Sequence, residues 1–409
     1  MSITKDKAAS VAAETYGLPA TRLLLEDVSS GWIVSVNENP EAYSDGLIGS
    51  AKLFIASEDG STKLFPSWPN ALIKRELGLP YEHGDAPAPE GVAKKPVVCV
   101  INCGSNSTKV LIRDKERVFL RTTTVTKLSE AVETTGVLSK DAIARTVAVL
   151  TSAREACITF GVTEGRLIAT SALRDAKNAD EFLDVASKAC GLTALVITGD
   201  QEAGYAFTAS TRGTSSTTAL VIDIGGSSTE LAKENSLVGL DTASLQLGCV
   251  RLKEKALGEG PVTSERETVA NHMISDSIDQ ARAANYWLTD PALHELHAIV
   301  IGGTAECLTS MQSARELRLK NPHASLDVLS LSGKKFSAAK VRFWRDALLA
   351  LSPAELSQVP GLVLGREDTI VAGLFILDAL LQTFAVTEVT YQESSIVDAI
   401  AEELLEDLN

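Results

Sequence analysis

The chain has 409 residues, of which 45% are hydrophobic and 22% charged, a globular composition that excludes a wholly disordered protein. This length exceeds one ordinary hydrophobic core and predicts two or three domains. The formal net charge of −15 argues against nonspecific nucleic-acid binding, which needs basic side chains to neutralise phosphates, but is compatible with a small anion held by backbone N–H groups.

The first 85 residues differ in pattern from the rest. A linker rich in proline, glycine and small residues follows them at 86–95. Upstream of it, one helical pattern precedes three strand patterns, at 5–16, 31–37, 51–57 and 62–65. We therefore predict a small α+β domain of unknown role at 1–85. Its runs GWIVSVN and AKLFIASEDGSTKLFPSW weakly resemble YrhB-like immunity domains, and no catalytic constellation occurs there.

After the linker, strand patterns alternate with helical patterns, which predicts an α/β fold. The continuous apolar run at 97–103 is typical of a buried strand. Further strands are expected at 109–113, 118–124, 166–170 and 195–198. Ser139 is a good N-cap for a long amphipathic helix through Phe160, and a second helix is expected at 179–189.

An internal repeat stands out in this region. VINCGSNSTKV at 100–110 and VIDIGGSSTEL at 221–231 align without a gap, 121 residues apart. Each is a buried strand, a turn of glycine and serine, a pair of hydroxyls and an outgoing strand. Glycine lets the backbone approach an anion and adopt a positive φ, so that N–H groups converge on phosphate oxygens. Ordinary tight hairpins use the same residues, but the two copies and a third Gly-Gly-Thr at 302–304 favour a phosphate-binding cleft.

Other candidate sites are weak. The six cysteines lack a CxxC pair, which disfavours zinc and predicts a reduced, cytoplasmic setting, and alternate buried strand positions explain Cys99 and Cys103 as well as a redox pair does. His294 and His297 have HxxH spacing without an acidic partner motif, which favours a solvated helix face. We see no secretion signal and no apolar stretch of about 18 residues, and expect no membrane association.

Six ordered motifs carry a family resemblance. INCGSNSTKVLI, ATSALRDAKNADEF, ITGDQEAGYAF, VIDIGGSSTELA, SLQLGCVRLKE and IGGTAECL resemble the Ppx/GppA exopolyphosphatase/guanosine-pentaphosphate phosphohydrolase family in order and spacing, over about 96–409. PGLVLGREDTIVAG is similar to a later arginine-containing segment of the family. The chain has no His-Asp dipeptide and resembles the short form, without an HD-type domain.

The resemblance implies two ribonuclease-H-like domains of the actin/Hsp70/sugar-kinase superfamily around a cleft. We place the first at 96–210, with 392–409 as a candidate completion, and the second at 211–391. The resemblance also implies a homodimer and a Mg²⁺ or Mn²⁺ cofactor.

Site residues follow from the resemblance position by position. Glu202 would be the general base that activates water, Arg174 would contact phosphate, and Asp223 and Glu230 would bind the metal. Arg251 and Arg366 are further candidate contacts for the polyanion. The two loops would bind phosphate through Gly104, Ser105, Asn106, Ser107 and Thr108 and through Gly225, Gly226, Ser227, Ser228 and Thr229. The chemistry is coherent, since a carboxylate can take the proton of water while cations and N–H groups stabilise the phosphoryl charge.

Several of these residues also have a structural explanation. Glu202 near the start of a helix would complement the helix dipole. Arg174, Arg251 and Arg366 would each form a structural ion pair. These alternatives stay open at the level of sequence.

Four departures from the family pattern concern rate, metal affinity and substrate choice. The first loop begins with Asn102 where the family has aspartate. The neutral amide of asparagine is a weak metal ligand, and in this detail the loop is closer to those of acetate kinases. Gln201 replaces one of two glutamates, and Ser227 replaces a glycine, which matters if its φ is positive. TYQESSIVDAI stands where the family has a motif rich in arginine and glycine.

The leading hypothesis is metal-dependent hydrolysis that releases orthophosphate from inorganic polyphosphate or guanosine pentaphosphate. The alternatives are a phosphotransferase similar to acetate or sugar kinases and a non-catalytic sensor of polyphosphate or an alarmone. We expect the metal on the second loop, and expect the first loop to grip phosphate through N–H groups, hydroxyls and Lys109.

Overall fold

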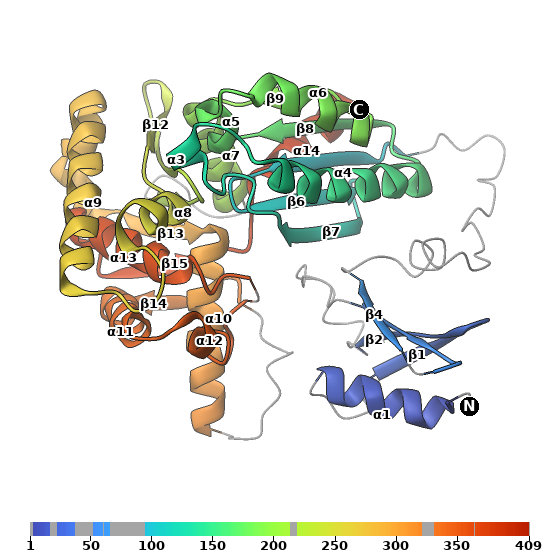
Figure 1. Cartoon of the computed structure of the whole chain (residues 1–409). Coiled ribbons are helices and arrows are strands. Elements are labelled where there is room, and N and C mark those ends of the chain that lie inside the picture. Colours follow the sequence, from blue (N-terminus) through green and yellow to red (C-terminus); the bar gives the residue numbers. More distant parts are fainter. Residues whose placement is uncertain are drawn as a thin grey trace.

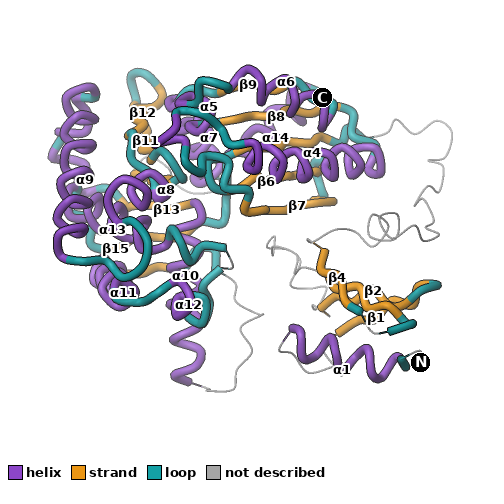
Figure 2. Tube along the Cα trace, in the orientation of Figure 1, coloured by secondary structure: helices purple, strands orange, loops and turns teal. Residues whose placement is uncertain are grey.

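The structure is a computed structural model that describes residues 3–16, 23–36, 52–59, 61–65, 95–212, 219–320, 331–363 and 365–408. These residues form three β-sheets with helices packed on them (Figures 1 and 2). Of the predicted linker, 86–94 lie outside the described residues. No helix among the described residues is long and apolar enough to cross a membrane.

The N-terminal sheet is antiparallel, in the order β1-β2-β3-β4, and carries one helix. Its elements are α1 (Lys5–Tyr16), β1 (Leu23–Val28), β2 (Gly31–Val36), β3 (Lys52–Ala56) and β4 (Thr62–Phe65). Ala8 and Ala12, one helical turn apart, are buried in a small core with Trp32, Val34 and Ile55. The predicted helix and three strands are confirmed. β1 was not predicted, because its run LLLEDV does not alternate apolar and polar residues.

The second sheet has the order β7-β6-β5-β8-β9. Its strands are β5 (Val98–Cys103), β6 (Ser107–Arg113), β7 (Val118–Val125), β8 (Glu164–Ala169) and β9 (Ala194–Val196). The short helices α3 (Val132–Thr135) and α5 (Ser171–Asp175) lie in its connections, and α4 (Lys140–Phe160) and α6 (Ala179–Cys190) pack beside one another. The predicted cap of α4 is confirmed, since the Ser139 side chain accepts from Ala142 N. Cys99 and Cys103 are both buried on β5, and all six cysteines are free.

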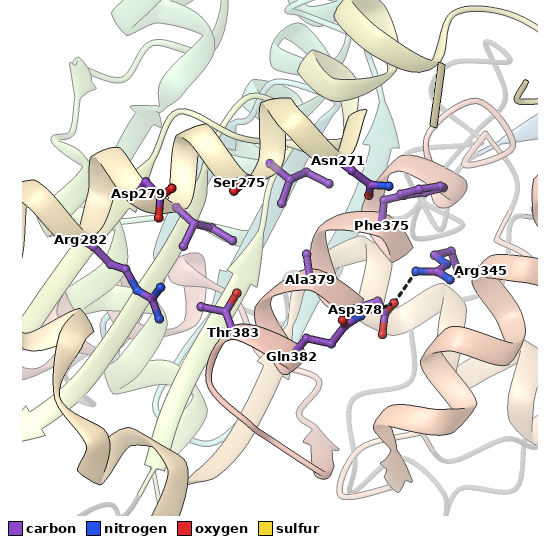
Figure 3. A pocket seen from close by; sticks show the side chains of 12 residues that line it. Asn271, Ser275, Asp279, Arg282, Arg345, Phe375, Asp378, Ala379, Gln382 and Thr383 are labelled. Carbon is purple, nitrogen blue, oxygen red and sulfur yellow. Dashed lines mark hydrogen bonds and ion pairs between the residues drawn. The ribbon is translucent and has the colours of Figure 1, made fainter. Parts of the chain in front are cut away.

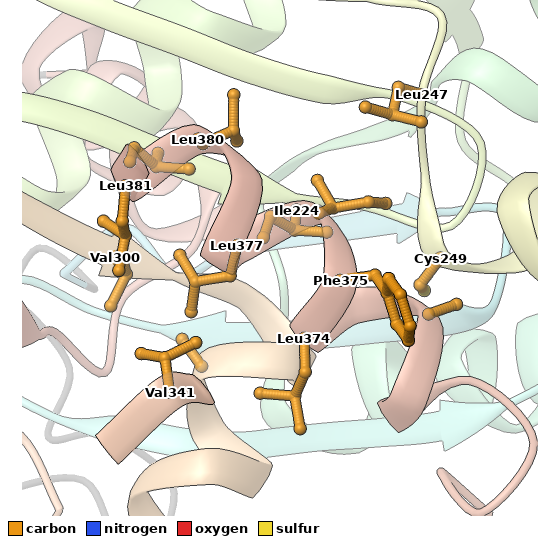
Figure 4. Close-up of a cluster of buried hydrophobic side chains, with 14 of the residues drawn as sticks. Ile224, Leu247, Cys249, Val300, Val341, Leu374, Phe375, Leu377, Leu380 and Leu381 are labelled. Atoms are coloured by element: carbon orange, nitrogen blue, oxygen red, sulfur yellow. The ribbon is translucent and has the colours of Figure 1, made fainter. Parts of the chain in front are cut away.

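The third sheet has the order β12-β11-β10-β13-β15-β14. Its strands are β10 (Ala219–Ile224), β11 (Thr229–Asn235), β12 (Gly239–Leu245), β13 (His297–Ile301), β14 (Lys335–Ser337) and β15 (Glu388–Tyr391). The associated helices are α8 (Cys249–Leu252), α9 (Ser264–Ala284), α10 (Gly302–Lys320), α11 (Ala338–Leu349), α12 (Pro353–Leu356) and α13 (Ile370–Thr383). α13 is apolar almost all round and is buried; Leu374 and Leu377 lie in one core with Val300 and Val341 (Figure 4).

The two larger sheets repeat one topology. In each, three antiparallel strands are followed by parallel strands, so that β5–β6–β7 corresponds to β10–β11–β12 and β8 corresponds to β13. The gapless sequence repeat therefore belongs to a duplicated fold unit. It places the two glycine turns at equivalent ends of equivalent strands.

Two helices lie between the repeated sheets (Figure 1). α7 (Gly199–Thr211) packs against β10, β11 and β12, and α14 (Ile396–Asp407) packs against β5, β6 and α7. Ion pairs also attach α14 to the first repeat, including Arg166 Nη1 to Glu403 Oε1 at 2.6 Å. The domain limits proposed from the sequence stay a prediction. By those limits α7 belongs to the first domain, yet it packs on the sheet of the second repeat.

Candidate active site

The two glycine loops are two copies of the same β-turn. Asn102 pairs with Lys109 across the first hairpin, and Asp223 pairs with Glu230 across the second. The turn is closed by Gly104 N donating to Ser107 O at 3.1 Å, and by the equivalent Gly225 N donating to Ser228 O at 2.9 Å. Residues that align in the two sequence copies therefore make the same backbone hydrogen bonds in the two hairpins.

The hairpins meet face to face, and this contact explains the glycines. A Cβ on Gly226 would lie 2.6 Å from Ser105 Cβ and 3.1 Å from Asn106 N, too close for any side chain. A Cβ on Gly248 would lie 2.4 Å from Gly226 O. The expectation of a positive φ in the two loops is wrong, because none of their glycines has one, and Ser227 does not either. Ser227 therefore fits this backbone without strain, and close approach is what demands glycine here.

A cleft lies between the hairpins and is lined by residues from both repeats. Its walls include the start of the third Gly-Gly-Thr element, at Gly302 and Gly303, and the segment that precedes α14, at Ser395. Eight of the predicted site residues line it: Gly104, Ser105, Asn106, Ser107, Glu202, Asp223, Gly225 and Gly226. Asn102, Lys109 and Arg366 also line it.

The other loop residues support the hairpins from behind the cleft. The Thr108 hydroxyl is fully buried and bonds the Thr126 hydroxyl at 3.0 Å. The Thr229 hydroxyl, also fully buried, donates to Leu247 O. Ser228 is buried as well, and its Oγ lies 3.5 Å from Arg174 Nη2. A direct phosphate contact by these hydroxyls stays a prediction, and their observed bonds hold the turns in place.

Glu202 reaches the cleft from the first turn of α7. Thr198 caps this helix in a capping box with Gln201, whose Oε1 accepts from Thr198 N at 2.9 Å. Glu202 Oε2 accepts from Arg174 Nη1 at 3.0 Å. Burial raises the pKa of Glu202 to about 7, although Arg174 opposes that shift, and the charge of Asp223 adds to it. Gln201 thus has a capping role, and Glu202 has the pKa that a general base at neutral pH needs.

Asp223 and Glu230 lie on one face of the second hairpin, because directly opposed residues of an antiparallel pair point the same way. Glu230 is 1% exposed, and its Oε1 accepts from Ser244 Oγ at 2.8 Å. Burial and the charges of Glu202 and Asp223 raise the pKa of Glu230 well above its usual range. Burial also raises the pKa of Asp223, with Lys109 opposing the shift. Three carboxylates therefore share one poorly solvated region.

Such a region fits a divalent cation, which would favour the ionised form of each carboxylate. The described residues contain no group of three or more side chains placed to hold one metal ion. Mg²⁺ usually keeps several waters and takes one or two protein carboxylates, so Asp223 and Glu230 would suffice to hold Mg²⁺ or Mn²⁺; that they bind it stays a prediction. His294 and His297 do not share a helix face, since His297 opens β13 and bonds Thr390 Oγ1 at 2.7 Å.

The two predicted arginines have different surroundings. Arg174 donates to Glu202 and to Ile197 O, at 2.9 Å, and its Nη2 lies 3.8 Å from Glu230 Oε1. It therefore links Glu202 to the second hairpin. Arg251 is 8% exposed and donates to Ser227 O at 2.7 Å, and its guanidinium also pairs with Glu133 and Asp175. The structural explanation holds for Arg251, and a phosphate contact by it stays a prediction.

Arg366 is the second arginine for which the sequence left an anion contact and an ion pair open. It is 8% exposed, lines the cleft and lies 3.4 Å from Ser107 Oγ through Nη2. Among the described residues it has no carboxylate partner within 4.0 Å. A Cβ on Gly303 would lie 2.4 Å from its guanidinium, so the second glycine of the Gly-Gly-Thr element makes room for it. The signal was present in the sequence as the arginine of PGLVLGREDTIVAG, which alone does not separate an ion pair from an anion contact.

Two buried polar atoms at the cleft lack partners. Asn102 Oδ1 and Asn106 Nδ2 are buried and make no hydrogen bond among the described residues. Leaving such groups unsatisfied is costly, and a bound ligand or water would satisfy them. The Asn106 amide group and Lys109 of the first hairpin, together with Arg366, make this side of the cleft rich in hydrogen-bond donors.

The structure is thus a duplicated α/β unit with a cleft between two matching hairpins, and Glu202, a buried carboxylate with a raised pKa, lines that cleft. The model of the Ppx/GppA phosphatase family matches residues 111–405, and the chain belongs to this family. The match begins after the first phosphate loop. The family and the class of hydrolase predicted from the sequence, which acts on acid anhydrides, are confirmed.

Relatives and solved structures agree with this assignment. Exopolyphosphatase 2 of Mycobacterium tuberculosis is 27% identical over 324 residues, which cover 74% of this chain and 97% of the relative. The guanosine-5'-triphosphate,3'-diphosphate pyrophosphatase of Vibrio cholerae is 26% identical over 322 residues, 76% of this chain and 60% of the relative.

The predicted α/β fold of two domains is confirmed by two crystal structures, each 23% identical to this chain. An exopolyphosphatase-like protein has a TM-score of 0.68 and covers 76% of this chain and 100% of its own. A Ppx/GppA family member from Aquifex aeolicus has a TM-score of 0.58 and covers 77% and 99%.

Proposed function

We propose that this enzyme releases orthophosphate from the end of inorganic polyphosphate or guanosine pentaphosphate, with Glu202 as the general base. The observation that carries the proposal is the position of Glu202, a nearly buried carboxylate with a pKa of about 7, at a cleft between two phosphate-type hairpins. The relatives' names, exopolyphosphatase and guanosine-5'-triphosphate,3'-diphosphate pyrophosphatase, supply the two substrate classes.

Substrate binding is assigned to the first hairpin. The Asn106 amide group, the Lys109 ammonium and the Arg366 guanidinium line the cleft and are the donors best placed for phosphate oxygens. Backbone N–H groups of the turn would add further donors. An arginine without a carboxylate partner binds an anion more tightly than a paired one, because no salt bridge has to be broken.

The second hairpin and Arg174 complete the chemistry. Glu202 accepts a proton from water as the water oxygen bonds to the terminal phosphorus. The bridging P–O bond then breaks, and its electron pair stays on the shortened chain. Arg174 holds Glu202 in position through the bond at 3.0 Å and stabilises its ionised form. When bound at Asp223 and Glu230, Mg²⁺ or Mn²⁺ would neutralise charge on the phosphoryl oxygens.

The same proposal includes the setting of the enzyme. We place it in the cytoplasm as a homodimer, in line with its free cysteines and the family resemblance. Size-exclusion chromatography with light scattering would test the dimer.

Glu202→Gln tests the mechanism directly. The variant keeps the shape of the side chain but cannot accept the proton, so phosphate release from polyphosphate and from guanosine pentaphosphate should fall by about 10²–10⁴-fold. Both substrates are assayed side by side with Mg²⁺ and with Mn²⁺. Asp200→Asn is the matched control, because Asp200 is acidic, exposed and in the same first turn of α7. It should retain activity, and equal losses in the two variants would assign the effect to the helix dipole.

The alternatives give other results in these assays. A non-catalytic sensor would bind polyphosphate in calorimetry without releasing phosphate. A phosphotransferase would form ADP from ATP only when an acceptor is added.

A further inference from the structure

Each of the two glycine turns is held from outside by a later segment of the chain. Ser129 N donates to Ser105 O at 2.9 Å in the first repeat, and Val250 N donates to Gly226 O at 2.7 Å in the second. The two donors are 121 residues apart, as are the two acceptors, which is the spacing of the sequence repeat. The supporting segments therefore begin as part of the duplication. We call residues 126–135 the first brace and residues 249–257 the second brace.

The braces also hold the next carbonyl of each turn. Asn106 O accepts from Thr126 N at 3.1 Å and from Lys127 N at 2.9 Å. Ser227 O, at the equivalent position of the second turn, accepts from Arg251 Nε at 2.7 Å. The first brace thus holds its turn with backbone groups, whereas the second also uses the Arg251 side chain.

Both braces have an unusual backbone. Lys127 and Ala131 have φ values of 48° and 62°, and they are two of the three non-glycine residues with a left-handed φ in the described chain. In the second brace, Lys253–Leu257 is the only π-helix among the described residues, a rare element that is frequent at functional sites. Left-handed residues other than glycine persist only where surrounding contacts fix them. The place where the braces meet supplies such contacts.

Glu133 of α3 is the centre of that contact. Its Oε1 lies 2.6 Å from Arg251 Nη1, and its Oε2 lies 2.6 Å from Lys255 Nζ. Next to it, Ala131 N donates to Glu254 Oε1 at 3.1 Å. The Glu133 side chain is only 9% exposed, so solvent screens its ion pair with Arg251 little. One carboxylate of the first repeat therefore holds two cations of the second.

Two further ion pairs support this contact. Arg251 also pairs with Asp175 of the first repeat, and Lys127 of the first brace pairs with Asp368, which precedes α13. Through these contacts a continuous chain of bonds runs from the carbonyls of the first turn, along the first brace, to Glu133. It continues through Arg251 to the Ser227 carbonyl of the second turn.

Two ion pairs elsewhere in the molecule lie within the second repeat. Asp378, in the groove between α9 and α13, pairs with Arg345 of α11 (Figure 3). Glu316 of α10 pairs with Lys340 of α11 at 2.8 Å. Breaking such a pair changes stability but leaves the two glycine turns connected. Glu316 is therefore a suitable comparison for Glu133.

We propose that Glu133 is a positioning residue for phosphate release, because it fixes the distance between the two glycine turns. This inference rests on the proposed function. In that mechanism Asn106 and Lys109 of the first hairpin contact phosphate, whereas Glu202 is on α7, which packs on the sheet of the second repeat. Loosening the contact between the braces therefore moves the bound phosphate relative to the base. A misplacement of about 1 Å can slow a reaction by about 10²-fold.

Glu133→Gln tests the role in turnover. The variant keeps the shape of the side chain but removes the charge that Arg251 and Lys255 share. Its kcat for phosphate release should fall by at least about tenfold, while KM changes by less than about threefold, because the proposed phosphate contacts remain. Glu316→Gln, the matched control, should keep both constants, and thermal unfolding checks that both variants are folded. An unchanged kcat, or a loss confined to KM, would overturn the positioning role.

Hydrogen exchange of the substrate-free protein tests the contact without turnover. The amides of Thr126, Lys127 and Ser129 bond the first turn, and in Glu133→Gln they should exchange at least about tenfold faster than in the wild type. In Glu316→Gln they should exchange as in the wild type. Unchanged exchange in Glu133→Gln, with an active wild type, would contradict the contact alone. A wild type that releases no phosphate from polyphosphate or guanosine pentaphosphate would instead remove the proposed function, and with it the role of Glu133 in turnover.

Discussion

The first hairpin, β5–β6, and the second, β10–β11, have the same register and the same turn bond but opposite side-chain chemistry. The pair opposite the turn is Asn102 and Lys109 in the first and Asp223 and Glu230 in the second. In the proposed mechanism, the first hairpin therefore contacts the anion directly, and the second contacts it through a bound cation. The two turns keep the same backbone with glycine and serine, and we propose that one register pair in each copy separates phosphate binding from metal binding.

The largest expected difference between the hairpins is the effect of removing Asp223. Asp223→Asn leaves the buried side chain its shape but removes a proposed metal ligand, and kcat/KM for phosphate release should fall by about 10²–10³-fold. Asn102→Ala changes the equivalent position of the first hairpin and should cost less than about tenfold, since a neutral amide is a weak metal ligand. Steady-state assays across a range of Mg²⁺ concentrations measure both. Equal losses would mean that the two hairpins do the same job.

Acidic pH should inactivate the enzyme through the second hairpin and its neighbour. Glu202 must be ionised to accept a proton, and its pKa is raised to about 7. Below that pH, kcat/KM should fall by about tenfold for each pH unit, because the ionised fraction falls by that factor. Raised pKa values for Asp223 and Glu230 act in the same direction. A flat profile between pH 5 and pH 7 would exclude Glu202 as the base. Asp200→Asn should leave the profile unshifted.

The first hairpin should show its role in KM. Arg366→Gln removes a buried cation beside Ser107, and a charge-assisted hydrogen bond of about 1.5–3 kcal/mol corresponds to a KM raised by about 10–100-fold. Arg251→Gln is a useful contrast, because Arg251 is bound to Glu133 and Asp175 and supports the Ser227 carbonyl. It should lower the melting temperature with little change in KM. A raised KM for Arg251→Gln together with an unchanged KM for Arg366→Gln would instead assign the phosphate contact to Arg251.

The smallest effect concerns the contact between the hairpins. Gly226→Ala forces a Cβ to within 2.6 Å of Ser105 Cβ and should destabilise the fold by about 1–3 kcal/mol, with a matching loss of activity. Gly204→Ala, in α7, has no heavy atom nearer than 4.0 Å and should raise stability by about 0.5–1 kcal/mol. Urea denaturation compares the two. A neutral Gly226→Ala would show that the hairpins do not rely on this approach.

Local patterns in the sequence predicted most of the strands, the cap at Ser139 and the equivalence of the two loops. These features depend on residues close together along the chain, so periodicity and spacing reveal them. The family motifs pointed to Glu202 and Asp223, and both line the cleft. The pairing of Arg251 with Glu133, across more than a hundred residues, has no local signal. The place of Ser395 in the cleft likewise depends on how α14 packs between the sheets.

The position of α14 has a consequence for synthesis. The sheet that it covers is complete at Val196, whereas α14 begins at Ile396, so its covering helix leaves the ribosome about 200 residues later. At about 5–20 residues per second, the apolar face of β5 and β6 waits roughly 10–40 s for Ile396, Ile400 and Leu404. During this interval the nascent first repeat has an apolar face that α14 does not yet cover. The cleft, which Ser395 and Ile396 line, therefore forms only after α14 has been made.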